Sequence, residues 1–468
     1  MKTKLFNIFL FAFLSASIYG QDIILTLPQN GSVYVNDVNS NVFLSIDLAR
    51  YLNVSKSITL PNTSDSTLGV IYKGGNRFIH DYTAPGKDGK NTFIGINSGN
   101  FTMGGGSGSY LASYNTGVGQ STLSSLTTGS NNAAFGNQAL TKNTTGNNNN
   151  AFGIGSLRNN TTGEENSAFS SLPNNTTGYS NSGFGYGSLS SNTTGSGNSA
   201  FGHFALGNNI TAGSNSAFGQ LALSQSDANS NSAFGYRSLG SSTTGYSNAA
   251  FGDNSLFGNM SGNYNSAFGS SAGFDVTTGT NLTLVGYNAQ PSSGSASNEI
   301  TLGDNNITAL RCAVQSISTL SDERDKRNIK DLKLGIGFLM KLKPRQFNWD
   351  KRDWYAKHVS DGTKMEQTPT AGFIAQELDK VQLSENAEWL HLVLKDNPER
   401  MEATAGNLLP IIVKAIQELK VENESIKTEN VMLKERLIRY EKMQAVFFTE
   451  LEKLKANTHE STKVSMGE

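Results

Sequence analysis

A regular spacing of aromatic residues dominates the middle of the chain. Phenylalanine recurs in the phrase Asn-Ser-Ala-Phe-Gly and its variants, mostly every 17 residues, with one spacing of 15 and one of 16. These phenylalanines are Phe135, Phe152, Phe169, Phe184, Phe201, Phe218, Phe234, Phe251 and Phe268. A leucine follows five residues after most of them, and Asn-Thr-Thr-Gly or a variant separates many repeats. Such a period predicts a repeat architecture over residues 91–310.

The content of one repeat indicates how the repeats must pack. One phenylalanine and one leucine cannot bury a core within a single unit, so stacked units would line the apolar side chains into ladders, with each coil hydrogen-bonded to the next. The glycine after each phenylalanine and the glycine closing Asn-Thr-Thr-Gly would permit positive φ at corners. Asparagine and threonine beside them would satisfy turn backbone groups locally. Calcium-binding nonapeptide repeats are excluded because they need aspartate.

The start of the chain has the pattern of a secretory signal. A basic Met1–Lys4 precedes an apolar run from Leu5 to Tyr19 and a small residue, Gly20. This predicts a signal peptide over residues 1–20 and export of the protein, with cleavage after Ser17 as the alternative. Strand-like runs separated by turn signals then predict an N-terminal β region over residues 21–90. No later segment is expected to cross a membrane as a helix.

The last helix carries a heptad pattern. Apolar and polar residues alternate spacings of three and four, as a coiled-coil seam requires. The seam positions are Ile416, Leu419, Asn423, Ile426, Asn430, Leu433, Leu437, Tyr440, Gln444, Phe447, Leu451 and Leu454. A helix packed on its own domain is the alternative, but this seam is longer than a domain of about a hundred residues can cover. The pattern predicts a coiled coil over residues 411–456.

Between the repeats and that helix, the pattern predicts further strands and a helix. Residues 307–320 are expected to form strands, with Cys312 as a small buried residue in one of them. Residues 330–341 are expected to form a short amphipathic helix. The fold class is therefore mainly β with C-terminal α: a parallel β-roll or solenoid, a small α+β domain and a coiled coil.

Composition and charge exclude several functions. Net charge is −1, with 37 Lys and Arg against 38 Asp and Glu, so no bulk field favours nucleic acid. The single cysteine cannot form a disulfide within the chain. The five histidines are scattered, and no metal or other cofactor is expected. Asp and Glu are sparse between residues 91 and 290, which disfavours carbohydrate cleavage by the repeats.

Candidate chemistry lies at the end of the repeats, where Ser321 stands five residues before Lys326. A lysine can act as general base for a serine hydroxyl once burial or a nearby positive charge lowers its pKa from about 10.4 toward neutrality. The alternative from the residues alone is a solvated charged run that opens a helix, with Ser321 as its N-cap.

Motifs spread over the following hundred residues give this segment a family likeness. They are Ser321-Asp322-x-Arg324-x-Lys326, Asn328-Ile329, Pro344 to Trp349, Gly372 to Glu377 and Ala415 to Leu419. In this order they resemble the C-terminal intramolecular chaperone and auto-processing domain of phage tailspikes and tail fibres, here placed at residues 319–419. The resemblance implies that Ser321 attacks a backbone carbonyl with Lys326 as base. It further implies that Asp322 and Arg324 support the pair, and that the cut falls between Leu320 and Ser321.

The repeats resemble the head repeats of trimeric bacterial adhesins, which implies a trimeric roll; a lone solenoid is the alternative. The sequence therefore predicts a secreted or surface-exposed, homotrimeric fibre of the adhesin or tail-fibre kind, whose C-terminal domain assembles the trimer and cuts itself off. Host or cell-surface glycans or proteins would be its partners. A structural adhesin that keeps its chaperone domain is one alternative, and a carbohydrate-processing tailspike is another.

Overall fold

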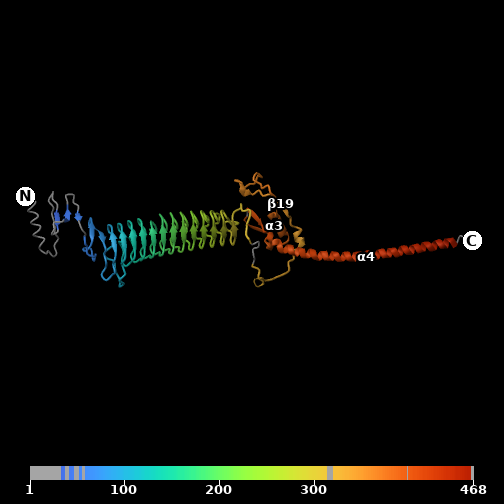
Figure 1. Ribbon diagram of the computed structural model, residues 1–468, viewed down its shortest axis with the longest axis horizontal. Coiled ribbons are helices and arrows are strands. Elements are labelled where there is room, and N and C mark those ends of the chain that lie inside the picture. The colour runs from blue at the N-terminus through green and yellow to red at the C-terminus, as the bar shows by residue number, and fades with distance from the viewer. Residues whose placement is uncertain are drawn as a thin grey trace, which may run out of the picture. The chain divides into compact units, whose positions relative to one another are not determined.

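The structure is a computed structural model that describes residues 33–36, 42–46, 52–54, 58–313, 320–397 and 399–464. The predicted signal peptide lies outside the described residues. The chain divides into two compact units, Met1–Ser199 and Ala200–Glu468, and each is described by itself. Figure 1 shows the short repeated strands and the long helix α4.

The first unit begins with antiparallel strands. Strands β1 (Val33–Asn36), β2 (Val42–Ile46) and β3 (Leu52–Val54) form one small sheet. Strands β4 (Ile71–Lys73) and β5 (Asn76–His80) form a hairpin, and β5 pairs with β6 (Thr92–Ile94). Gly74 and Gly75 lie between β4 and β5 with φ of 57° and 77°. Two consecutive residues with positive φ are typical of the tight hairpin turn that the Lys-Gly-Gly-Asn sequence predicts.

From β6 to β18 the strands are parallel and three residues long. In the first unit they are β7 (Thr116–Val118), β8 (Ala133–Phe135), β9 (Asn150–Phe152), β10 (Ser167–Phe169) and β11 (Ser182–Phe184). The others are β12 (Ser199–Phe201), β13 (Ser216–Phe218), β14 (Ser232–Phe234), β15 (Ala249–Phe251), β16 (Ser266–Phe268), β17 (Thr283–Val285) and β18 (Ile300–Leu302). Phenylalanine pairs with phenylalanine in register from β8 to β11 and from β14 to β16. The predicted parallel β-solenoid is confirmed.

The interior of the coils is built from alanine and leucine. The central residue of each strand from β8 to β17, such as Ala134 or Ala217, is buried, and so is the leucine five residues after the phenylalanine, such as Leu140. The phenylalanines do form ladders, but on the outer side of the strands: Phe169 is 39% exposed. Successive side chains of a strand point to opposite faces, so burying the central alanine places its two neighbours outside.

The two kinds of glycine in the repeat have different roles. Gly219, after a phenylalanine, has φ of 136°, and a Cβ there would lie 2.4 Å from the carbonyl oxygen of Gly235. Gly146, which closes Asn-Thr-Thr-Gly, was expected to have positive φ, and this expectation is wrong. It is required because a Cβ would lie 2.3 Å from the carbonyl oxygen of Gly163 in the next coil. Leu140 instead makes a left-handed corner, with φ of 50°.

Asparagine side chains form a hydrogen-bonded ladder inside the coils. Asn166 is fully buried, and its Nδ2 donates to Asn149 Oδ1 at 3.1 Å and to the carbonyl of Gly178 at 2.9 Å. Its Oδ1 accepts the backbone N–H of Asn181 at 3.0 Å and the Asn181 Nδ2 at 3.1 Å. Asparagine therefore connects one coil to the next as well as satisfying turns locally. Buried amides such as that of Asn166, with donors and acceptors paired, therefore share the coil interior with alanine and leucine.

This ladder should contribute measurably to stability. Replacing Asn166 by alanine leaves the buried N–H of Asn181 without its acceptor, and an unsatisfied buried group costs about 1–3 kcal/mol. We expect the free energy of unfolding of the Asn166→Ala variant to fall by about that amount in urea denaturation. Asn159→Ala is the matched control, because Asn159 bonds Asn174 at the solvent-exposed side of the same coil. Equal losses in the two variants would contradict a stabilising interior ladder.

A buried histidine lies at the start of the solenoid. His80 is 4% exposed, its Nε2 lies 2.8 Å from the carbonyl oxygen of Ser98, and its Nδ1 accepts the backbone N–H of Tyr82 at 3.3 Å. Its ring centroid lies 4.9 Å from those of Phe93 and Phe101. Burial lowers the pKa of His80, because the charged ring would lose water that these neighbours do not replace.

The first coil should therefore lose stability in mild acid. The folded state binds a proton at His80 less readily than the unfolded state does. The stability that the neutral His80 gives the folded state is therefore fully present above the ordinary histidine pKa of about 6.5, and it is lost as pH falls below that value. We expect the thermal midpoint of wild type to fall more between pH 7.5 and pH 5 than that of His80→Gln. Identical pH dependence in the two proteins would contradict this assignment.

The segment after β18 differs from its prediction. No strand follows in residues 303–313, and Cys312 is exposed, so the expectations of strands and of a buried cysteine there are wrong. The remaining positions of the predicted strands, 314–319, lie outside the described residues. The run is apolar enough for a strand, but no neighbouring strand in the described part of the chain pairs with residues 303–313.

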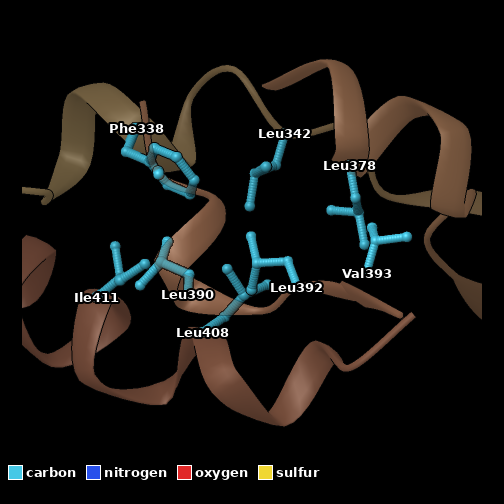
Figure 2. Close-up of a cluster of buried hydrophobic side chains, with 9 residues drawn as sticks. Phe338, Leu342, Leu378, Leu390, Leu392, Val393, Leu408 and Ile411 are labelled. Carbon is cyan, nitrogen blue, oxygen red and sulfur yellow. The ribbon is translucent and has the colours of Figure 1, made fainter. Parts of the chain in front are cut away.

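The second unit ends in an α+β region. Its elements are η1 (Glu323–Asp325), α2 (Ile336–Leu339), β19 (Arg345–Phe347), η2 (Arg352–Trp354), β20 (Thr370–Gly372), α3 (Ala375–Ser384), η3 (Glu388–Leu390), β21 (Val393–Asn397), β22 (Arg400–Ala403), η4 (Ala405–Leu408) and α4 (Leu409–Val464). Strands β19 and β20 pair antiparallel, as do β21 and β22. Figure 2 shows its core, where side chains from several of these elements converge. The core residues are Phe338, Leu342, Leu378, Ala387, Leu390, Leu392, Val393, Leu408 and Ile411.

Helix α2 is much shorter than the predicted helix over residues 330–341. It spans four residues, and Gly335 precedes it while Gly337 lies within it. Glycine weakens a helix, so residues 330–335 are not helical, and a helix forms only where packing supports it. The support comes from α4: Glu418 Oε2 accepts the first helical N–H, that of Ile336, at 2.8 Å. Phe338 then packs in the core beside Ile411, the third residue of α4.

Candidate active site

A tight turn holds the residues of the predicted dyad. Helix η1 is a single 3₁₀ turn, and Asp322 caps its start by accepting the backbone N–H of Arg324 at 2.8 Å. The backbone N–H of Lys326 donates to the carbonyl of Glu323 at 3.0 Å and closes the turn. An aspartate at this position is a preferred cap, because its carboxylate satisfies an N–H that the helix leaves free. The turn reverses the chain, so that residue 326 returns toward residue 321.

Ser321 and Lys326 are in contact. Lys326 Nζ lies 2.5 Å from Ser321 Oγ and 3.1 Å from the carbonyl oxygen of Ser321. The five-residue separation noted in the sequence thus becomes a direct hydrogen bond between the hydroxyl and the amine. A hydroxyl within hydrogen-bond reach of an amine is the geometry that proton transfer from a nucleophile to its base requires.

Asp322 and Arg324 bond to each other and not to the dyad. The Arg324 guanidinium donates to both carboxylate oxygens of Asp322, with Nη2 2.6 Å from Oδ2 and Nε 3.0 Å from Oδ1. These bonds from the Arg324 side chain, together with its backbone N–H, lower the pKa of Asp322, and the same pair raises the pKa of Arg324. The Asp322 carboxylate thus both caps the turn and pairs with the Arg324 guanidinium.

The whole turn is exposed to solvent in the single chain. Residues 320–330 are exposed, and Leu320, on the amino side of the predicted cut, is fully so. Burial is one of the effects that can make a lysine a base, and the side chains of this turn are not buried in the single chain.

Arg327 is a residue of this turn that the sequence reasoning missed. Its Nη1 donates to the carbonyl of Arg324 at 2.9 Å and to that of Lys326 at 2.8 Å. These bonds occupy two backbone carbonyls at the end of the 3₁₀ turn. The only feature of the sequence that pointed to a role for Arg327 in this turn was its position directly after Lys326.

Helix α4 presents the predicted seam to solvent. It is 56 residues long, and beyond the core its apolar seam side chains remain exposed except for the partly buried Leu451; Leu433 is 49% and Leu437 58% exposed. A row of half-exposed leucines at heptad spacing on a free helix is the arrangement that coiled-coil partners cover.

No group of three or more His, Cys, Asp or Glu side chains in the described part of the chain could hold a metal ion. None of the described helices combines the length and the apolar character needed to cross a membrane.

Comparison with known proteins finds a family match in the segment that begins at Ser321. Residues 321–387 match a family described as chaperone of endosialidase. No curated protein and no solved structure matches the chain. The matched segment begins at Ser321 and covers η1, α2, α3 and strands β19 and β20. With a β-solenoid before it and a family match of this kind at its C-terminal part, the chain is similar to tail-fibre proteins that carry a C-terminal chaperone domain.

Proposed function

We propose that this protein is an exported, homotrimeric fibre whose C-terminal domain assembles the three chains and then separates by self-cleavage. The observation that carries the proposal is the Nζ–Oγ contact of 2.5 Å between Lys326 and Ser321, at the first residue of the chaperone-family match. The solenoid would be the mature fibre, at the cell surface or secreted. The domain over residues 319–419 and the coiled coil over residues 411–456 would act during its assembly.

The cleavage would be a single turnover within the chain. Ser321 Oγ attacks the carbonyl carbon of Leu320 while Lys326 Nζ takes the hydroxyl proton. The Leu320–Ser321 C–N bond breaks, the proton passes to the departing nitrogen, and an ester joins Leu320 to Ser321 Oγ. Water then hydrolyses this ester, which frees the Leu320 carboxylate and restores the serine. Asp322 and Arg324 would hold the turn that aligns the two reacting groups.

Assembly would switch this chemistry on. An amine with an ordinary pKa of about 10.4 is a poor base at neutral pH, and burial is one way of lowering it. The turn is exposed in one chain, so the missing burial would come from the neighbouring copies. Cleavage would then follow trimer formation and would not occur in an isolated chain.

The trimer itself is supported by the seam of α4. Its apolar positions are exposed in the single chain, and Asn423, Asn430 and Gln444 share one heptad position. Polar residues at such a position weaken a coiled coil but select its register and number of chains. A non-local β-structure folds slowly, because distant segments must meet before any contact is made. A coiled coil that brings the chains into register would help the solenoid to form.

A second candidate function is a fibre that keeps its chaperone domain attached. The exposure of the dyad favours it, since an exposed lysine next to a serine can also be a simple surface hydrogen bond. Intact-mass measurement of the expressed protein beside its Ser321→Ala variant distinguishes the two functions.

A further inference from the structure

Charged residues border the apolar seam of α4. In the heptad notation of a coiled coil the seam residues take positions a and d, and positions e and g form the two edges of the seam. With Ile416 at position a, the charged residues at g are Glu422, Glu429, Arg436 and Glu450. Those at e are Lys420, Lys427, Lys434, Glu441 and Lys455. Figure 1 shows α4 as one continuous helix, so a single heptad frame holds along the seam.

The two edges match each other in charge. When two helices of a coiled coil run parallel, each g residue of one helix lies beside the e residue five positions further along the other. The charged residues that meet in this way are Glu422 with Lys427, Glu429 with Lys434, Arg436 with Glu441, and Glu450 with Lys455. All four pairs are of opposite sign, and Met443 meets Phe448 as an apolar pair between them. The edges therefore favour a parallel copy of the same helix.

The charges in the middle of the edges have no partner in their own helix. They are Glu429, Lys434, Arg436 and Glu441, which are exposed and form no ion pair in the described structure of the single chain. None of them has an oppositely charged residue three or four positions away, the spacing at which side chains of one helix meet. Lys427 differs, since its Nζ lies 3.1 Å from Glu424 Oε1. A second copy would supply the opposite charges that the single chain does not.

We propose that α4 packs on α4 of a second copy in parallel and in register, with the middle charges of the two edges paired between the copies. The pairs are Glu429 with Lys434 and Arg436 with Glu441. This inference rests on the trimer of the proposed function and adds the direction and the register of its helices. Antiparallel packing would bring the e edges together, where lysine holds four of the five charged positions, so like charges would meet.

The reversal of charge along each edge excludes a slipped register. Glutamate and lysine hold g and e up to Lys434, whereas the next heptad has Arg436 at g and Glu441 at e. If one helix slid by a heptad, Glu429 would face Glu441 at one contact, and Arg436 would face Lys434 at the other. The first two asparagines of the seam lie one heptad apart, so an asparagine would still meet an asparagine after the slip. The charge reversal therefore penalises an error that these two amides tolerate.

Disulfide formation at two seam positions tests direction and register. A Cys312→Ser/Ser321→Ala background leaves no other thiol and keeps α4 attached whether or not the wild type cuts itself. Ile426→Cys and Leu454→Cys each place a thiol at position d, where parallel helices in register bring the same residue of each copy together. We expect both variants to give disulfide-linked dimers under mild oxidation. Thr428→Cys, on the outer side of the helix, should give about tenfold less, because thiols held too far apart cannot bond.

Exchanging the charges tests the ion pairs. In the same background, Glu441→Lys would set a lysine beside Arg436 of the neighbouring copy, and we expect the thermal midpoint of the trimer to fall by several degrees. Arg436→Glu/Glu441→Lys again pairs opposite charges and should recover the midpoint. Glu435→Lys is the matched control, because it makes the same change of charge at an exposed position away from both edges, and it should leave the midpoint nearly unchanged.

The double variant also tests the charge reversal, because it gives every charged pair the same order of signs. Co-expression of Ile426→Cys with Leu433→Cys places thiols one heptad apart on different copies, so a disulfide between the two variants reports a slipped helix. We expect this mixed disulfide to be scarce with the native charges and to rise severalfold when both chains also carry Arg436→Glu/Glu441→Lys. No rise would contradict a register set by the charge reversal.

Sedimentation of the same samples separates this inference from the trimer. If the protein sediments as a trimer, yet neither Ile426→Cys nor Leu454→Cys cross-links better than Thr428→Cys, the parallel register is overturned and the trimer is left intact. Cross-linking at only one of the two seam positions would also overturn it, since antiparallel helices bring at most one of these residues onto itself. A monomer would overturn both. Failure of Arg436→Glu to recover the loss caused by Glu441→Lys would overturn the ion pair.

Discussion

We expect denaturing electrophoresis of the expressed protein to show a C-terminal fragment, residues 321–468, of about 16 kDa in proportion to the 50.1 kDa of the 468-residue chain. Ser321→Ala and Lys326→Ala should each leave a single full-length band. The first variant removes the nucleophile, and the second removes the amine that lies 2.5 Å from it. Loss of either member of such a pair abolishes nearly all the chemistry, because the two act as a unit.

Intact-mass measurement adds the position of the cut. A new N-terminus at Ser321 supports the bond between Leu320 and Ser321. Glu323→Gln is the matched control, since Glu323 lies in the same exposed turn and its side chain contacts neither member of the dyad; it should cleave as wild type does. If wild type forms a folded trimer and stays full length, the dyad is structural, and the fibre keeps its chaperone domain.

Charges in the α4 seam should stop assembly and cleavage together. The Leu433→Asp/Leu437→Asp variant puts two carboxylates where coiled-coil partners would bury leucines, and each unpaired buried charge costs several kcal/mol. We expect this variant to sediment as monomer or aggregate, to lose most of its β-structure by circular dichroism, and to remain uncleaved. Ser321→Ala should differ from it by giving a soluble, β-rich, uncleaved trimer.

The control for the seam places the same charges on the opposite side of the helix. Thr428 and Thr449 lie off the seam, and each hydroxyl bonds a carbonyl one turn back, to Glu424 and Ala445 respectively. Thr428→Asp/Thr449→Asp should therefore assemble and cleave as wild type does, because threonine and aspartate have similar helix propensity. A Leu433→Asp/Leu437→Asp protein that still cleaves and yields a soluble β-rich stalk would show that α4 is not the nucleus of assembly.

The repeat period was sufficient to predict where the strands lie. Each parallel strand from β8 to β16 ends at one of the spaced phenylalanines, and the glycine after it takes positive φ in coils such as that of Gly219. The long helix also followed from its heptads, because an uninterrupted pattern of 3 and 4 spacings has only one regular structure that satisfies it. The contact of Ser321 with Lys326 was predicted through the family motif, and spacing alone left a solvated charged run open.

Other features depended on neighbours that a single repeat does not show. The expectation for Gly146 was wrong because close approach of the next coil, not its own φ, excludes a side chain there. Cys312 was expected in a strand, but a strand needs a pairing partner, and none lies beside residues 303–313 in the described part of the chain. The helix predicted over residues 330–341 is only Ile336–Leu339 in the structure, because glycines weaken it and it is supported by packing against α4.

The sequence by itself thus determined the elements whose stability is local or periodic: the strand at each phenylalanine and the heptad helix. The tertiary structure decided which side of each strand is buried. A three-residue strand shows one small residue between two others, and that pattern does not say which of its two faces meets the coil interior. Only the stacked coils reveal that alanine, leucine and paired asparagines fill the interior, which leaves the phenylalanines outside on a face of their own.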